Sequence, residues 1–396
     1  RDPAQHPGRA RPRPAQRAAM TGPLEGARVV EMAGLGPGPF AAMLLADLGA
    51  DVIRVDRTGR AARDAHLFAM HRGRRSVAVD PKHPDGREVV LRLVEGADAL
   101  IEGNRPGVME RLGLGPEECF GRNPRLAYGR MTGWGQEGRL SKDAGHDIDY
   151  IALSGALSVV ARHGERPVPP VNLVGDFGGG GMFLAFGLVA AMWNAARTGV
   201  GQVVDAAMVD GSAVLTTMLH GLIAQGEWRD EAGVNFADTG SPFYEVYECS
   251  DGRFVAVGAI ERPFYVALLN GLDLDETELP DRRDPTTWPA LKERFADVFA
   301  TRSRDEWAAH FAGTDACVAP VLTLTEAPQH PHNVERETFV DLGGVSQPSP
   351  APRFSRTPAA LRHVPPAAGD HTVEVLAEIG YDDEEIKRLF DAGAVQ

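Results

Sequence analysis

Two residues, His146 and Asp176, have the types and surroundings that acid–base chemistry requires. His146 lies in the polar segment 145–150, and Asp176 comes two residues before four consecutive glycines. An imidazole and a carboxylate that face one carbon can take a proton from one side and return one on the other. The alternative roles are a surface histidine and a helix-capping aspartate. We interpret the two residues as a candidate catalytic pair.

An apolar run, residues 182–193, follows the glycines and predicts a mostly buried helix. Asp176 would then lie near unpaired backbone N–H groups and the positive end of the helix dipole, which favour a charged carboxylate. Glycines weaken a helix start and have no side chains to pack. We therefore expect the four glycines to let a ligand approach the backbone.

The composition argues against several kinds of partner. The net charge of −14 disfavours nucleic acid and an anionic membrane surface, and no apolar run is expected to span a membrane. Cys119, Cys249 and Cys317 lie far apart in the sequence. This fits a reducing, cytoplasmic location and neither a disulfide framework nor a zinc site. His330 and His332 lack a third spaced ligand, so no metal site is expected.

Alternating strand and helix patterns predict an α/β fold. Strands are expected at residues 28–33, 51–56, 99–102, 126–131 and 202–206, and helices at 40–48, 85–95 and 210–222. Such alternation forms a parallel sheet, which predicts a large Rossmann-like domain. Residues 243–251 and 253–259 flank an Asp-Gly turn, which predicts an antiparallel hairpin within a small α+β domain.

The expected domain boundaries follow changes in composition. Residues 1–19 are rich in Arg and Pro and are expected to be a disordered extension. We expect residues 20–224 to form the first part of the large domain and residues 225–345 the small domain. Residues 346–396 are expected to form a Pro-rich connector and helices that return to the large domain.

The chain as a whole is acidic, but seven arginines lie within or after the second predicted strand. They are Arg54, Arg57, Arg60, Arg63, Arg72, Arg74 and Arg75. Loops after parallel strands bind ligands, and arginine suits phosphate oxygens. The alternative is a solvated surface loop. Glycines before the first helix, with Asp56 after them, also suggest a dinucleotide-dependent oxidoreductase. This is the lesser hypothesis because Pro39 replaces the third glycine.

Three motifs carry a resemblance to a known family. Residues 144–150, 173–180 and 201–208 resemble the racemase branch of the family III CoA-transferases, and the similarity runs from about residue 20 nearly to the C-terminus. The resemblance implies an interlocked homodimer with shared active sites and an acyl-CoA thioester as substrate. It implies no metal and no cofactor beyond the coenzyme A of the substrate. The implied reaction is racemisation of 2-methylacyl-CoA thioesters through an enolate.

The resemblance also implies roles for individual residues. His146 would act on the S substrate, Asp176 on the R substrate, and Glu261 would hydrogen-bond and orient His146. Asn172 is expected to be a partner of Asp176 and to contact substrate. Further substrate contacts are implied for Arg57, Val79, Asp80, Pro81, Lys82, Gly145, Asp147, Ile148, Asp149 and Tyr150.

The main competing function is CoA transfer. In that reaction Asp176 would be a nucleophile that forms a mixed anhydride with the acyl group. His146 favours the racemase, because a transferase needs one carboxylate whereas a racemase needs a second acid–base group. A binding protein without turnover is a third class, which the presence of both residues disfavours.

Overall fold

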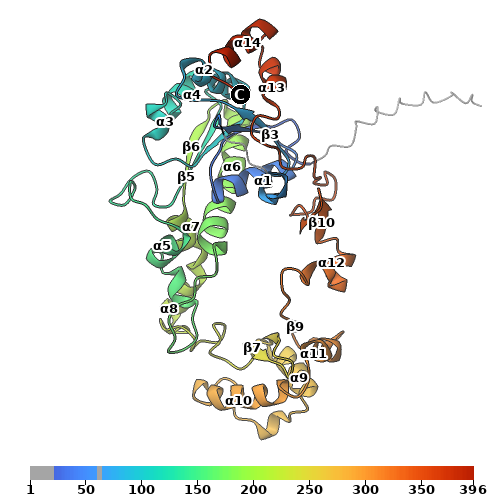
Figure 1. The fold of residues 1–396 in the computed structure, drawn as a ribbon. Coiled ribbons are helices and arrows are strands. Elements are labelled where there is room, and N and C mark those ends of the chain that lie inside the picture. The colour runs from blue at the N-terminus through green and yellow to red at the C-terminus, as the bar shows by residue number, and fades with distance from the viewer. Residues whose placement is uncertain (1–21, 60–64) are drawn as a thin grey trace, which may run out of the picture.

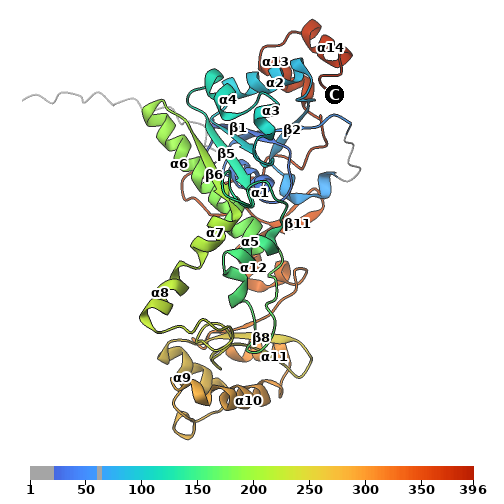
Figure 2. The same ribbon diagram turned by 90° about the vertical axis from the view of Figure 1, so that its left-hand side faces the viewer.

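The computed structural model describes residues 22–59 and 65–396. The predicted extension 1–19, with Arg60 and Arg63, lies outside the described residues. A six-stranded sheet with helices on both faces lies at one end of the molecule, and a smaller group of helices and strands lies at the other (Figure 1). Two segments join these parts, one after α8 (Thr217–Gln225) and one after β9 (Val318–Pro320), as Figures 1 and 2 show.

The six strands of the large sheet are all parallel and lie in the order β3-β2-β1-β4-β5-β6. They are β1 (Arg28–Met32), β2 (Asp51–Asp56), β3 (Arg74–Ala78), β4 (Ala99–Glu102), β5 (Ala127–Thr132) and β6 (Gln202–Ala207). The chain reverses its direction of winding between β1 and β4, where sheets of this type bind ligands. The predicted Rossmann-like fold is confirmed.

Helices bury an apolar core on each face of this sheet. One face carries α1 (Pro37–Asp47) and α6 (Met182–Thr198). The other carries α2 (Pro84–Glu95), α4 (Pro116–Arg122), α13 (Thr372–Glu378) and α14 (Asp383–Asp391). Because successive strand residues point to opposite faces, the neighbours Val29 and Val30 belong to different cores although both are fully buried.

The sequence does not predict β3, because its first two residues read as part of a basic loop. In the structure Arg74 is fully buried, and its Nε lies 2.6 Å from Glu31 Oε2 on β1. The neighbouring Arg75 pairs with Asp51 on β2, at 2.7 Å, and with Glu378 on α13, at 2.7 Å. These partners, which are distant in the sequence, allow a charged segment to form a strand. A local sequence pattern cannot predict them.

Two more arginines of the basic cluster form buried ion pairs. Arg54 Nε lies 2.7 Å from Asp56 Oδ2, and Arg72 Nη2 lies 2.6 Å from Asp47 Oδ2 on α1. Breaking one buried pair typically costs about 3–5 kcal/mol, because the remaining charge loses its partner. The prediction that the whole cluster serves phosphate binding is therefore wrong for Arg54, Arg72 and Arg74, which hold the sheet together.

The smaller part is built on the predicted hairpin, which is confirmed. Strand β7 (Tyr244–Glu248) pairs antiparallel with β8 (Phe254–Gly258), and β9 adds a third strand. The helices α9 (Arg262–Gly271), α10 (Trp288–Phe299) and α11 (Arg304–Phe311) enclose an aromatic core against them. The exact domain boundaries at residues 225 and 345 stay predictions.

The last part of the chain returns to the large sheet. It passes through α12 (Pro331–Glu335) and the hairpin of β10 (Phe339–Leu342) and β11 (Val345–Pro348). The backbone N–H of His371 donates to the carbonyl of Ser76 on β3, and that of Gln396 donates to Ala78. The C-terminal helices are thereby fixed beside β3.

The glycine run does not precede the long helix but belongs to it. Residues Leu173–Gly181 form a π-helix, η4, that continues directly into α6. The resulting 26-residue helix is long and apolar enough to cross a membrane by length and composition, which corrects the expectation that no run reaches that length. Only one face of α6 is buried, because Phe186 is 74% exposed and Trp193 66%. The prediction of a mostly buried helix is wrong on this point.

The glycines of η4 do serve packing, contrary to the prediction. A Cβ at Gly179 would lie 2.6 Å from the backbone nitrogen of Ser212 on α7 (Met208–Leu215), and one at Gly181 would lie 2.7 Å from the ring of Phe40 on α1. Reciprocally, a Cβ at Gly211 would overlap the carbonyl of Gly179. Two helices can approach this closely only where both lack side chains.

Substitution of Gly211 by Ala should therefore destabilise the protein by about 1–3 kcal/mol or more, because the added methyl group forces η4 and α7 apart. Gly221→Ala on α8 is the matched control, since a Cβ there meets nothing within 4 Å and should stabilise the helix by up to about 1 kcal/mol. Denaturant unfolding at one protein concentration measures both variants. Equal stability of the two variants would contradict the close helix contact.

Candidate active site

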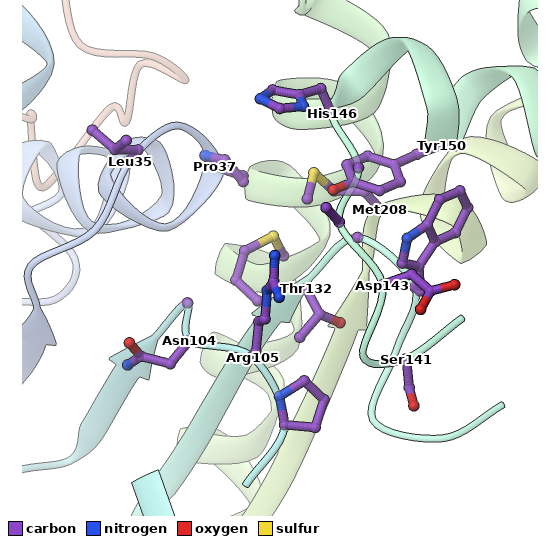
Figure 3. A pocket seen from close by; sticks show the side chains of 17 residues that line it. Leu35, Pro37, Asn104, Arg105, Thr132, Ser141, Asp143, His146, Tyr150 and Met208 are labelled. Atoms are coloured by element: carbon purple, nitrogen blue, oxygen red, sulfur yellow. The ribbon is translucent and has the colours of Figure 1, made fainter. Parts of the chain in front are cut away.

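A cavity of about 290 Å³ lies beyond the carboxyl ends of the strands, where the strand order reverses. Figure 3 shows the side chains that line it, among them Leu35, Pro37, Asn104, Arg105, Thr132, His146, Tyr150 and Met208. A second cavity of about 320 Å³ shares Leu35 and Asn104 with the first and extends to Arg57. Both cavities lie at the edge of the sheet that carries the predicted ligand loops.

His146 and Asp176 both belong to the crossover that connects β5 to β6. This crossover passes through α5 (Asp147–Leu153), η4 and α6. His146 is the residue immediately before α5, and its exposed imidazole lines the first cavity (Figure 3). Its backbone N–H donates to Asp149 Oδ2 at 2.9 Å, which fixes the start of the helix.

Asp176 lies in the first turn of η4, half-buried beside α1. Asn172 Nδ2 donates a hydrogen bond to its Oδ2 at 3.2 Å, so the predicted contact between these residues is confirmed. Burial raises the pKa of Asp176 above its ordinary value, and the charge of Asp147 raises it further, whereas Asn172 and His146 lower it. The sequence predicted that the helix dipole would favour the charged form of Asp176. That prediction is wrong, because desolvation of the carboxylate has the larger effect on its pKa.

Asp147 connects the two halves of the candidate pair. Its side chain is 7% exposed, and its Oδ1 accepts a hydrogen bond from the backbone N–H of Asp176 at 2.6 Å. The residue before Asp176 must be small for this contact, since a Cβ at Gly175 would lie 2.5 Å from Asp147 Oδ1. The carboxylate of Asp147 thus faces Asp176 and is not among the side chains that line the cavity, where it was predicted to contact substrate.

The other predicted residues around α5 differ in their exposure. Tyr150 lines the cavity and packs edge-on against Trp134, with ring centroids 4.8 Å apart. Burial raises the pKa of Tyr150 to about 12, with smaller contributions from nearby carboxylates, so the hydroxyl keeps its proton at neutral pH. Gly145 lines the same cavity, whereas the side chains of Ile148 and Asp149 are exposed.

The predicted coenzyme A contacts lie after β2 and β3. Arg57 is exposed, lines the second cavity and makes no ion pair with any residue of the described ranges. Asp80 and Pro81 are partly exposed and Lys82 is exposed, whereas the side chain of Val79 is fully buried in the core. A substrate contact through the side chain of Val79 is therefore excluded in this structure, and only its backbone remains for one.

Sequence reasoning missed two polar residues of the cavity, Asn104 and Arg105. They follow β4 directly, and the backbone N–H of Asn104 is held by Glu102 Oε2 at 2.7 Å. Arg105 is exposed and forms no ion pair with a described residue. Their position after a predicted parallel strand is the signal that could have identified them.

Glu261 is not brought to His146 within one chain. It is the residue before α9, in the smaller part of the molecule, and neither cavity at the edge of the large sheet includes it. In Figure 1, α9 lies at the opposite end of the molecule from the large sheet. The predicted orienting contact is therefore not formed within one chain.

Metal ligands are not assembled in the described parts of the chain. Within residues 22–59 and 65–396, no cluster of three or more His, Cys, Asp or Glu side chains is placed to hold a metal ion. Cys119 and Cys249 are buried, Cys317 is exposed, and all three are free thiols. A cytoplasmic location stays a prediction.

The parallel sheet, with an imidazole and a carboxylate on its last crossover, defines an α/β protein with a candidate acid–base site. The chain belongs to CoA-transferase family III, whose family model matches residues 24–372.

Within that family the chain is similar to racemases. It is 50% identical over 370 residues to the alpha-methylacyl-CoA racemase of Mus musculus and 48% identical over 369 residues to that of Homo sapiens. Each match covers 92% of this chain and 96% of the relative. A CAIB/BAIF family protein from Brucella suis has a similar structure, with a TM-score of 0.79 and 26% identity over 91% of this chain and 100% of that one.

Replacement of Arg57 by Ala should raise KM for an acyl-CoA on the order of ten- to a hundred-fold, because a hydrogen bond to a charged group contributes about 1.5–3 kcal/mol. The turnover number kcat should change less, since a phosphate contact binds the ground state and the transition state alike. Steady-state kinetics with full acyl-CoA and with a truncated thioester that lacks the nucleotide measure the effect.

Arg75→Ala is the control for this experiment. The guanidinium of Arg75 is paired with Asp51 and Glu378, so the substitution should lower the melting temperature. The ratio of KM for full acyl-CoA to KM for the truncated thioester should stay unchanged. If Arg57→Ala impairs the full and the truncated substrate equally, Arg57 does not bind the nucleotide.

Proposed function

We propose that this protein racemises 2-methylacyl-CoA thioesters. The observation that carries the proposal is that His146 lines the cavity and lies close enough to Asp176 for the imidazole to lower the pKa of the Asp176 carboxyl group. Similarity to two racemases over nearly the whole chain supports the same reaction. The two groups have the chemistry that inversion at an α-carbon requires.

The reaction follows from the acidity of the α-carbon. One group removes the α-proton, the negative charge passes to the thioester oxygen as an enolate, and the other group protonates the opposite face. In one direction Asp176 is the base and His146 the acid, and in the other their roles are exchanged. The raised pKa of Asp176 makes its carboxylate a stronger base than a solvated one, which favours removal of a weakly acidic α-proton.

A hydrogen-bond donor must face the enolate oxygen, and Tyr150 is suited to this role. Its hydroxyl makes no hydrogen bond with a residue in the described part of the chain, and its pKa of about 12 keeps it protonated. Loss of one such donor typically costs a factor of about 10²–10³ in rate. The substrate supplies coenzyme A. Arg57, Lys82 and Arg105 offer positive charge for it, because they form no ion pair with a residue of the described ranges. No further cofactor enters this proposal.

CoA transfer is the alternative reaction for this family. Asp176 alone would suffice as its nucleophile, and His146 would then have no function. Each single enantiomer of 2-methylacyl-CoA incubated in D₂O should become racemic and gain one α-deuterium, which mass spectrometry and chiral analysis detect. Formation of a new thioester with an added free acid, without α-deuterium in the original one, would contradict racemisation and indicate a transferase.

A homodimer is the second part of the proposal. Apolar side chains stand exposed along α6 and α8, among them Phe186, Trp193 and Met218, and such a face favours a protein partner over water. The smaller part is connected by two separate segments that lie far apart in Figure 1, which suits an interlocked pair. In such a pair, Glu261 of one chain would lie beside His146 of the other.

Co-refolding of His146→Ala with Glu261→Gln protein tests the shared site. Neither homodimer should be fully active, but one site of each mixed dimer keeps both groups, so part of the activity should return. Sedimentation should show a dimer that persists on dilution, because interlocked chains cannot separate without unfolding. A monomer at the concentration of the assay, or no recovery of activity over the unmixed proteins, would count against the shared site.

A further inference from the structure

We propose that Asp147 is a positioning residue for the reaction. Its carboxylate fixes the backbone of Asp176 relative to His146 and places a fixed negative charge beside the Asp176 carboxylate. The inference rests on the proposed racemase function, and it assigns to Asp147 a role towards Asp176 in place of contact with substrate.

The geometry of Asp147 points to this role. Its Oδ1 accepts the backbone N–H of Asp176 at 2.6 Å, while its buried Oδ2 has no hydrogen-bond partner among the described residues. No cation of residues 22–59 or 65–396 forms an ion pair with it. A buried carboxylate that is only half satisfied costs free energy, so fold stability does not explain its presence.

Asp147 is adjacent to His146 in the sequence, so one hydrogen bond connects both members of the catalytic pair. The first turn of α5 uses two carboxylates for this purpose. Asp149 accepts the N–H of His146 at 2.9 Å, and Asp147 accepts that of Asp176. The two contacts fix the backbones of His146 and Asp176 to one helical turn, and such fixed positions hold reacting groups in a productive geometry.

The charge of Asp147 also acts on Asp176 through space and raises its pKa. The other titratable groups that face Asp176 are His146 and Tyr150, which also come from the start of α5. Gly36, which precedes α1, lies beside the Asp176 carboxylate. The residues of α7 that lie against the glycines of η4 carry no charge: Met208, Gly211, Ser212 and Leu215. Asp147 is therefore the one fixed anion, among the described residues, that makes Asp176 a stronger base.

Two substitutions separate the positioning effect from the charge effect. Asp147→Ala removes the acceptor and should lower kcat on the order of a hundred-fold with little change in KM, because a small displacement of a catalytic group has this effect. Asp147→Asn keeps an oxygen that accepts the N–H of Asp176 but removes the charge. It should retain most of kcat and move the acidic limb of the pH profile to lower pH, since without that charge the pKa of Asp176 falls.

The acidic limb is measured with the R thioester, for which Asp176 is the base and must be deprotonated. Asp149→Asn is the matched control, because it removes a charge from the same helical turn that does not act on Asp176, and it should leave the acidic limb in place. Thermal melting establishes that each variant is folded.

The results distinguish the inference from the proposed function. If the wild-type protein incorporates no α-deuterium, the proposed function is wrong and the inference falls with it. If the wild-type exchanges and Asp147→Ala keeps kcat within about two-fold, the positioning role is overturned. If folded Asp147→Asn shows the wild-type acidic limb, the charge effect is overturned. A shift of that limb to lower pH, together with the loss of kcat in Asp147→Ala, supports both the charge effect and the positioning role.

Discussion

The hydrogen bond from the backbone of Asp176 to the carboxylate of Asp147 is the contact on which the candidate site depends. It joins α5 to the start of η4, two elements that residues 154–172 separate in the sequence. The contact needs Gly175 beside it, and η4 needs its glycines to lie close to α1 and α7. The glycine-rich segment therefore has a structural purpose that also determines the chemistry.

The large sheet provides the frame for this contact. Its parallel strands end at one edge, and the crossover between β5 and β6 carries both His146 and Asp176 to that edge. Most of the basic cluster is used inside the frame, where Arg74 pairs with Glu31 and Arg72 with Asp47. Arg57 is the exposed member of the cluster among the residues described, and it lies where a phosphate could approach.

Local patterns predicted five of the six parallel strands and the hairpin, because apolar alternation and turn residues determine them. They could not predict β3, whose arginines form a strand only through carboxylates distant in sequence. The same limit applies to the site. Motifs predicted the contact of Asn172 with Asp176, which is confirmed, and the catalytic pair, which stays a prediction. The direction of the pKa shift of Asp176 and the burial of Asp147 and Val79 depend on tertiary packing. Glu261 lies in the smaller part of the molecule, so its predicted contact with His146 is not formed within one chain.

The central claim is that His146 and Asp176 act on opposite faces of the same α-carbon. The most direct test is the stereochemistry of α-proton exchange in D₂O with each group removed singly. His146→Ala should exchange the α-proton of the R thioester through Asp176 with retention of configuration and leave the S thioester unlabelled. Asp176→Asn should do the reverse. Exchange of both enantiomers at the wild-type rate by either variant, or inversion by either one, would contradict the claim.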